Sequence, residues 1–407
     1  MSGSVDLKHP DFIADPHSAY RKLRLEEPVH WSPSLKGWVI TRHDLVSSVL
    51  LDPRFSVEKF APFVAHTSGD LRNKVEIVTG VLENWMVFRD PPQHQRLRAA
   101  LGKYFSPREI ERLRPRVLQI VDELIDAFIA TGRVELIQDF AVPLPTRVIG
   151  ELFGVGDHRV GSLKRWATDL GKFVTSARAT PDKYDRAARA VSEMIASFTD
   201  LLDERRRDPR QDLTSRLLEA GHDGEGLTQD EMISTLVLLL FAGHETTTNL
   251  IANGIYWLLR EPEQLAKLKA NPGLVASAVE EILRYEGPAQ TVVRLAKEDV
   301  RVGNSNIHHG DRLFLALNAA ARDPAVIEDA DAFKIDRGRT KHIAFGLGIH
   351  FCLGAPLARL EGQIALQRLL ARLEDLQLQT QLPQWSDDLV TRGMEQLHLT
   401  FRQRTAR

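Results

Sequence analysis

The segment from Gln229 to Arg260 constrains the fold more than any other part of the chain. It is long and apolar through its middle, with apolar residues at spacings of three and four, which is typical of a helix packed on several sides. Its most apolar run, 236–242, is followed by Gly243, His244 and Glu245. That run is far shorter than the roughly 20 apolar residues that cross a bilayer. We therefore predict a helix that crosses the core of a soluble protein.

Further helical patterns fill most of the chain, and short alternating runs supply a smaller β portion. We expect strands that join in one minor sheet from both ends of the chain, at 38–45, 312–317 and 397–401. We expect the other main helices at 106–131, 140–153, 183–206, 274–286 and 353–373. The predicted fold class is mainly α with a smaller β portion. The sequence has no Gly/Ser-rich or Pro-rich linker and no internal repeat, so we expect residues 1–407 to form a single domain.

Composition disfavours several classes of partner. The 407 residues carry a formal net charge of -2, which gives no global reason to expect nucleic acid or an anionic membrane. Hydrophobic residues make up 43% of the chain, enough for a large core. The amino terminus is polar and contains prolines where a signal peptide would be apolar, so we expect a cytoplasmic protein without a membrane anchor.

The single cysteine, Cys352, excludes an intramolecular disulfide and a zinc site built from several thiolates. Free cysteine is often a small buried core residue, but the sequence around this one favours chemistry. The phrase FGLGIHFCLG, 345–354, joins a glycine-rich loop to the start of a helix. Gly346, Gly348 and Gly354 permit positive φ and close approach of the backbone, so a flat macrocycle would fit there. Nearby N–H groups would stabilise a thiolate, and a bound ferric ion would displace its proton.

This phrase resembles the cysteine-ligand motif of the cytochrome P450 family. The matching positions are Phe345, Gly346, Gly348, His350, Cys352 and Gly354. The resemblance implies the cytochrome P450 fold, with the long central helix crossing the site of heme b, which is iron protoporphyrin IX. It also implies that Cys352 is the iron ligand, that Phe345 shields the thiolate and that His350 contacts a haem propionate. A thiolate ligand donates electron density to iron and favours cleavage of the O–O bond.

A second match lies in the long helix, in AGHETT, 242–247. Glycine costs a helix about 1 kcal/mol relative to alanine, and threonine bonds back to preceding carbonyls, so we expect a local kink or opening. The resemblance implies that dioxygen binds against Ala242 and Gly243. It implies that Glu245 and Thr246 are catalytic and order water for proton delivery. The alternative, a solvated turn of a surface helix, is disfavoured by the apolar run that precedes it.

A third match is EILR, 281–284, where a spacing of three places Glu281 and Arg284 on one helical face. Taken alone, such a pair is usually a surface ion pair that contributes little stability. The resemblance implies a buried structural pair, joined by Arg337, that supports the cysteine loop.

A fourth match is DPPQHQRLR, 90–98, where His94 and Arg98 lie four residues apart on one helical face. Their side chains are suited to binding a carboxylate, although without the other motifs they would be a solvated helix face. The resemblance implies that His94, Arg98 and Arg294 hold the haem propionates.

The resemblance extends from WVITRHDL near the start of the chain to RGMEQLHLTF near its end. His308 and His398 stand where the family usually has proline, and Ala321 replaces a common asparagine. None of these departures removes a chemical group from the implied mechanism, and the two histidines affect only local turns.

The implied activity is that of a monooxygenase that inserts one atom of dioxygen into a small hydrophobic substrate, by hydroxylation or epoxidation. One cysteine cannot hold an iron–sulfur cluster, and no flavin segment is evident, so electrons are expected from a separate ferredoxin or flavodoxin with its reductase. We expect a monomer on which basic residues dock that acidic partner, although each of them is equally well explained as solvated charge. These residues are Arg96, Lys103, Arg108, Arg112 and Arg359.

The substrate pocket is expected at apolar positions, each of which also suits packed core. These positions are Trp85, Met86, Val87, Phe88, Leu239, Leu240, Ala289, Val292, Val293 and Met394.

Two other functions would suit a haem protein of this kind. One is a peroxygenase driven by hydrogen peroxide, which Glu245 and Thr246 disfavour because that chemistry needs no delivered protons. Its sites also favour an arginine that holds a substrate carboxylate. The other is a gas sensor or ligand carrier, for which the sequence offers no evident output or DNA-binding segment.

Overall fold

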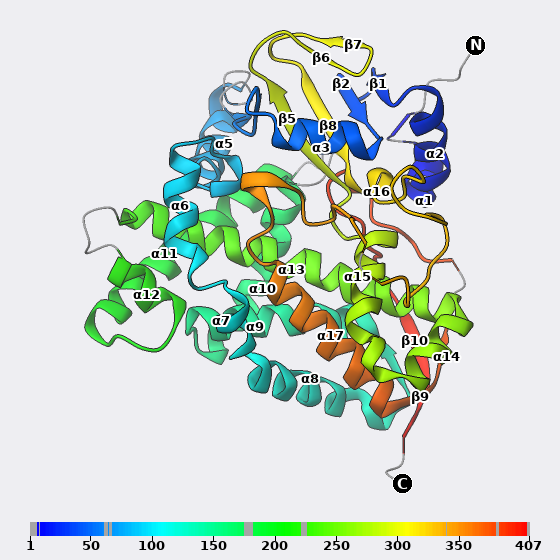
Figure 1. Ribbon diagram of the computed structural model, residues 1–407. Coiled ribbons are helices and arrows are strands. Elements are labelled where there is room, and N and C mark those ends of the chain that lie inside the picture. Colours follow the sequence, from blue (N-terminus) through cyan, green and yellow to red (C-terminus); the bar gives the residue numbers. More distant parts are fainter. Residues whose placement is uncertain are drawn as a thin grey trace.

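The computed structural model describes residues 6–7, 9–60, 64, 67–174, 182–220, 226–338, 340–379 and 382–404. Most of them are helical, and the helices gather below the main sheet in the view of Figure 1. The prediction of a mainly α chain with a smaller β portion is confirmed.

The long helix α13 spans Gln229–Arg260, as its apolar pattern predicts. Thr228 begins it with a capping box: the Thr228 hydroxyl accepts from the Glu231 N–H at 3.2 Å, and the Glu231 carboxylate accepts from the Thr228 N–H at 2.9 Å. Helices on several sides pack against α13, and Figure 1 shows it running through the middle of the helical region. Its main neighbours are α9 (Pro143–Phe153), α10 (Asp157–Val174), α15 (Val275–Glu286) and α17 (Ala355–Arg372).

Other helices surround this centre. They are α1 (Pro10–Ala14), α2 (Pro16–Glu26), α3 (His43–Leu51), α5 (Gly69–Leu82), α6 (Gln93–Gly102), α7 (Pro107–Glu111), α8 (Arg114–Phe128), α11 (Lys183–Arg207), α12 (Leu213–Ala220), α14 (Pro262–Ala270) and α16 (Leu317–Ala320). The helix expected over 106–131 is divided into α7 and α8, because Pro115 falls in the first turn of α8 and lacks the N–H that a continuous helix needs. The helix expected from residue 140 begins at Pro143, after a π turn at Ile137–Ala141.

The main sheet has five strands in the order β1, β2, β8, β5, β3. Their bounds are β1 (Val29–Ser32), β2 (Gly37–Ile40), β8 (Arg312–Ala316), β5 (Thr291–Ala296) and β3 (Phe55–Ser56). Strand β2 pairs with β8 in parallel, so the expected strands near residues 38 and 312 do lie side by side. The first of them ends at Ile40, and α3 begins three residues later.

The expectation that residues 397–401 join the same sheet is wrong. Strand β10 (His398–Gln403) lies in a separate three-stranded sheet, between β4 (Arg133–Glu135) and β9 (Leu373–Leu378). Alternation along a strand shows which face is buried but not which strand it pairs with. A two-stranded ribbon of β6 (Val300–Val302) and β7 (Ser305–Ile307) completes the β portion.

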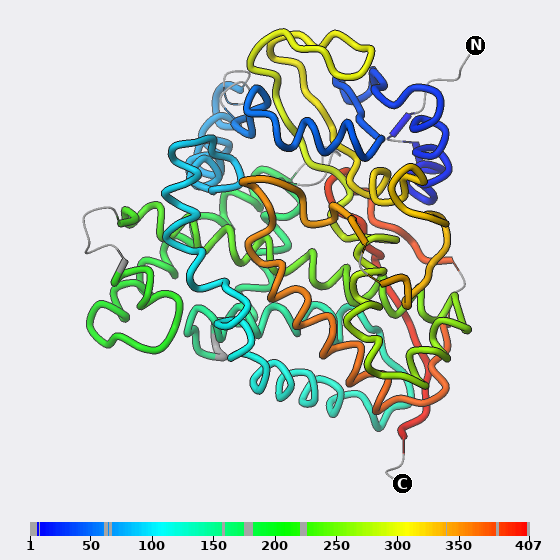
Figure 2. Tube along the Cα trace, in the orientation of Figure 1, coloured from blue at the N-terminus to red at the C-terminus, as the bar shows by residue number. Residues whose placement is uncertain are grey.

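Two distant parts of the chain meet at Glu286, which is almost fully buried at the end of α15. His17 Nε2 and Arg392 Nε each lie 3.0 Å from Glu286 Oε1. These contacts tie α2 to the segment before β10, although the blue N-terminal region lies in the upper part of Figure 2 and the red C-terminal strand reaches its lower part. Among the described residues, no helix has both the length and the apolar character to cross a membrane.

Candidate active site

Cys352 lies in a tight loop just before α17. Its N–H donates to the carbonyl of Phe345 at 2.9 Å, and the N–H of Gly346 donates to the carbonyl of Ile343 at 2.9 Å. Gly346 and Gly348 have φ of 72° and 71°, in the left-handed region that strongly favours glycine. The loop therefore depends on both glycines to fold back toward the cysteine.

Two opposing effects act on the Cys352 sulfur. Burial raises the pKa of the thiol, while backbone N–H groups at the start of α17 and the guanidinium groups of Arg98 and Arg359 act to lower it. The helix start thus favours the thiolate, as expected, but burial outweighs it. The sulfur ionises once a metal ion takes the place of its proton.

The middle of α13 presents an accessible face. Ala242 is exposed and Thr246 is partly exposed, although most residues along this helix are buried. Thr246 Oγ1 donates to the Ala242 carbonyl at 2.7 Å, which is the back-bonding that the sequence predicts. The segment stays helical, so the expected interruption does not occur. A Cβ at Gly243 would lie 3.0 Å from Ile149 Cδ1, so this glycine lets α13 pack closely on α9.

Glu245 directs its carboxyl group toward α10 and the C-terminal part of the chain. Thr391 Oγ1 donates to Glu245 Oε1 at 2.8 Å, and a Cβ at Gly171 would lie 3.3 Å from Glu245 Oε2. Burial and the negative charge of Asp388 raise the pKa of Glu245 to about 7, against the opposing effect of the Thr391 hydrogen bond. The carboxyl group therefore exchanges its proton near neutral pH.

His94, Arg98, Arg294 and His350 form a cluster of cations and donors. The ring centroids of His94 and His350 lie 4.3 Å apart, and the buried Nδ1 atoms of both rings lack hydrogen-bond partners among the described residues. Burial and neighbouring positive charges lower the pKa of His350 to about 3. Burial also lowers the pKa of Arg294 to about 10, despite the opposing charge of Asp90. Buried donors and cations of this kind are stabilised by an anion, and their number suits two carboxylates.

Glu281 and Arg284 form a buried ion pair on α15. Arg284 donates two hydrogen bonds of 2.7 Å to the Glu281 carboxylate, and Arg337 Nε lies 3.3 Å from Glu281 Oε2. Arg284 also donates to the carbonyls of Ala330 and Ala332, at 2.7 and 2.9 Å. These bonds fix the segment that leads toward the cysteine loop.

Apolar residues expected in the pocket reach α13. Trp85 stacks on Phe88 with ring centroids 5.7 Å apart, and on Phe241 of α13 with centroids 5.2 Å apart. Farther along the chain, Ala289 pairs with Thr391 in an isolated β-bridge, which places that segment beside the partner of Glu245.

The other expected pocket residues differ in exposure. Met86, Leu239, Leu240 and Met394 are buried, Val292 and Val293 are partly buried, and Val87 is exposed.

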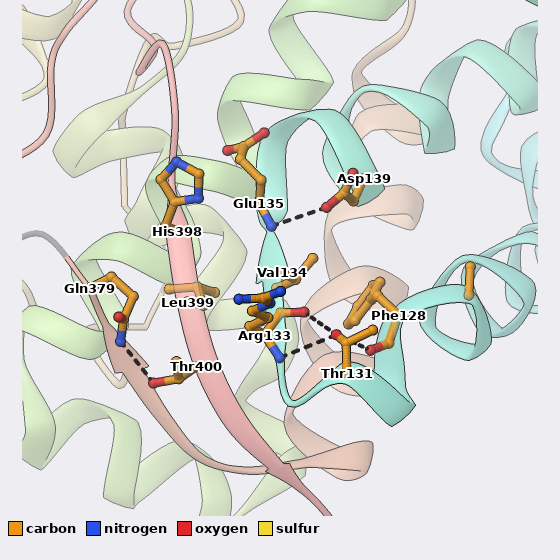
Figure 3. Close-up of a pocket in the computed structure, with 11 residues that line it drawn as sticks. Phe128, Thr131, Arg133, Val134, Glu135, Asp139, Gln379, His398, Leu399 and Thr400 are labelled. Atoms are coloured by element: carbon orange, nitrogen blue, oxygen red, sulfur yellow. Dashed lines mark hydrogen bonds between the residues drawn. The ribbon is translucent and has the colours of Figure 1, made fainter.

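A cavity of about 740 Å³ lies elsewhere, beside β4, β10 and the end of α8 (Figure 3). Among the described residues, none of the expected site residues lines it. Its polar groups largely bond to one another: Gln379 Nε2 donates to Thr400 Oγ1 at 3.0 Å, and the Glu135 N–H donates to Asp139 at 3.1 Å.

Sequence reasoning missed three polar residues, of which Thr391 and Glu361 are buried and Lys59 is partly buried. Thr391 contacts Glu245 across 146 positions of the chain, and no local pattern indicates such a contact. Glu361 on α17 is almost fully buried, and burial raises its pKa to about 8. Lys59 lies near Arg294, and burial lowers its pKa to about 8.

These features suit a flat macrocycle that carries a metal ion and two carboxylates. The sulfur of Cys352 would supply a metal ligand, and the glycines let the backbone approach. Among the described residues, the buried Nδ1 atoms of His94 and His350 have no hydrogen-bond partner, so a bound carboxylate could satisfy them. The fold and the site thus define a haem-thiolate enzyme.

Comparison with known proteins identifies the family. The family model for Cytochrome P450 matches residues 38–392. Cytochrome P450 107B1 of Saccharopolyspora erythraea is 41% identical over 394 residues, covering 95% of each chain. The chain therefore belongs to the cytochrome P450 family. It is a haem-thiolate monooxygenase, and its cofactor is protoporphyrin IX haem.

Two solved structures share the fold. P450BioI in complex with acyl carrier protein ligated to hexadec-9Z-enoic acid has a TM-score of 0.90 and 36% identity, covering 96% of this chain and 99% of that chain. A myxobacterial cytochrome P450, CYP267B1, in complex with myristic acid has a TM-score of 0.88 and 40% identity, covering 97% of this chain and 98% of that chain.

Proposed function

We propose that this monooxygenase hydroxylates a long acyl chain, using electrons from separate redox proteins. The observation that carries the proposal is the aromatic wall of Trp85, Phe88 and Phe241, which reaches α13 one helical turn before Glu245. An extended apolar substrate matches such a wall. The acyl ligands of P450BioI and CYP267B1 support the same substrate class.

In this proposal the haem, when bound, supplies the reductive activation of dioxygen. Cys352 Sγ is the iron ligand, and Phe345 covers the sulfur. The N–H of Cys352, bonded to the Phe345 carbonyl at 2.9 Å, keeps the loop closed around it. His94, Arg98 and Arg294 hold the haem propionates. The imidazole of His350, in the cysteine loop, also contacts a propionate.

Glu245 and Thr246 deliver protons in this proposal. The Glu245 carboxyl group holds a proton near neutral pH, because burial raises its pKa to about 7. The Thr391 hydroxyl fixes that carboxyl group at 2.8 Å. Thr246 Oγ1 is held by the Ala242 carbonyl on the accessible face, where it orders a water that receives the proton. Such proton relays typically contribute 10²- to 10⁴-fold in rate.

Redox docking is proposed for the basic surface around α6 and α7. Three of the expected docking residues are in ion pairs: Arg96 with Glu231, Arg112 with Glu109 at 2.9 Å, and Arg359 with Glu280 at 2.6 Å. Lys103 and Arg108 are exposed and carry the remaining positive charge of this surface. An acidic ferredoxin or flavodoxin complements that charge. The chain works in this proposal as a monomer and as a single haem domain.

Ligand titration tests the substrate class. Tetradecanoic acid and 1-tetradecanol are titrated into the ferric protein, the change of spin state is followed, and the products are then identified with a ferredoxin and its reductase. The proposal expects a spin-state change and a hydroxylated chain. A macrolide or terpenoid that binds where neither acyl compound does would contradict it. Turnover with hydrogen peroxide that outpaces the reductase system would favour the peroxygenase alternative.

Reversal of charge tests the docking surface. Lys103→Glu with Arg108→Glu should slow reduction by the ferredoxin and weaken its salt dependence, whereas Lys22→Glu on α2 should not. Reduction that is insensitive to salt in the unaltered enzyme would contradict docking at a charged surface.

A further inference from the structure

Lys59 is a cation placed against aromatic rings instead of against an acid. Its Nζ lies 4.5 Å from the ring centroid of Phe88 and 5.8 Å from that of Phe60. Among the described residues, no carboxylate pairs with it. Arg294 is the charged group that acts on it, and its effect adds to that of burial.

Arg294 is similarly short of anionic partners. It is buried in β5, and its guanidinium donates to the carbonyl of Val293 at 3.0 Å. Asp90 lies near enough to act on it, but Asp90 also accepts from the N–H of Val57 at 3.2 Å. Lys59 is partly buried and Arg294 is buried, so the two neighbouring cations repel each other with little screening by solvent, and an anion between them removes that repulsion.

The rings beside Lys59 continue toward the active site. Phe60 meets Phe88 edge to face with centroids 4.9 Å apart, and Phe88 stacks on Trp85, which in turn stacks on Phe241 of α13. The ammonium of Lys59 thus lies at one end of an apolar row whose other end is Phe241, on the side of α13 that carries Glu245.

We propose that Lys59 and Arg294 form a subsite for a carboxylate group. Two molecules in this enzyme would carry one: the haem, through a propionate, and an acidic acyl substrate, through its head group. Only the second source rests on the proposed function. If the carboxylate is a haem propionate, Lys59 joins the cluster of His94, Arg98, Arg294 and His350 that holds the propionates.

Variants at Lys59 test the subsite. Lys59→Met removes the charge and keeps most of the stem, Lys59→Gln is a second neutral variant in case the first fails to fold, and Lys59→Arg retains the charge. Lys22→Met, on the exposed surface of α2, is the matched control. Circular dichroism and the Soret band show which variants are folded and loaded with haem.

Two measurements separate the sources. If the carboxylate belongs to the substrate, the neutral variants bind tetradecanoic acid about tenfold more weakly and 1-tetradecanol unchanged, as expected for about 1.4 kcal/mol lost from an ion pair. If it belongs to the haem, the neutral variants transfer haem to apomyoglobin several times faster, and the binding ratio of acid to alcohol stays the same. In both cases Lys59→Arg restores most of the effect.

Neutral variants that change neither the acid-to-alcohol ratio nor the rate of haem transfer would overturn the subsite. Equal weakening of acid and alcohol, with haem transfer unchanged, would also overturn it, because that pattern reports only lost packing. If neither compound shifts the spin state of the unaltered protein, the acyl substrate is refuted, and haem transfer alone decides the role of Lys59.

Discussion

Replacement of Glu245 by glutamine should remove a pH dependence that this carboxyl group gives the enzyme. Burial and Asp388 raise the pKa of Glu245 to about 7. Its protonated fraction therefore falls from about nine-tenths at pH 6 to about one-tenth at pH 8, a change of about tenfold. If the protonated form delivers the proton, product formed per electron consumed should fall by a similar factor across this range.

The glutamine variant should show low coupling, with most electrons lost as hydrogen peroxide, and this coupling should not vary between pH 6 and 8. The assay measures product, peroxide and electron donor consumed at each pH, with saturating ferredoxin. Unaltered coupling in Glu245→Gln, or the same pH dependence in both proteins, would refute the proton role of this residue.

The same pKa predicts a change in stability. The folded state binds more protons than the unfolded state between pH 4.5 and about 7, so the free energy of unfolding falls as pH rises through this window. A shift of this size costs the unaltered protein on the order of 3 kcal/mol above pH 8. Glu245→Gln should escape that loss, so its stability relative to the unaltered protein should rise between pH 5 and 8. Urea unfolding followed by circular dichroism measures the free energy of unfolding of both proteins. If the two values change with pH in parallel, burial does not disfavour the charged form of Glu245.

Three further changes follow from the site. Thr391→Val removes the hydrogen bond that lowers the pKa of Glu245, so the pH midpoint of coupling should move upward, while Thr391→Ser should keep it; an unmoved midpoint would contradict the contact. Glu281→Gln leaves the buried Arg284 without its anion and should cost roughly 3–5 kcal/mol in urea unfolding, and a loss below about 1 kcal/mol would show that the pair is not needed. Arg98→Leu should speed haem transfer to apomyoglobin, and an unchanged rate would argue against a propionate contact.

Local patterns predicted the elements better than their pairing. Both ends of α13 follow from the apolar period, and the glycine-rich loop before α17 is visible in the sequence. The partners of β10 could not be predicted, because its alternating pattern shows which face is buried but not which strands lie beside it.

Contacts between residues that are distant in the sequence were the main feature of the fold and the site that could not be predicted. The bond from Thr391 to Glu245 and the joining of His17 and Arg392 at Glu286 depend on how whole elements pack. Their residue types are common in loops and helix ends, so nothing local distinguishes them from solvated groups.

The carbon monoxide spectrum of the reduced protein tests the ligand assignment most directly. With Cys352 bound to iron, the complex should show the strongly red-displaced Soret band of a thiolate-ligated haem. Cys352→Ala should lose this band and its oxygenase activity while keeping its helical circular dichroism. A folded, haem-loaded unaltered protein whose carbon monoxide complex lacks the red-displaced band would contradict thiolate ligation by Cys352.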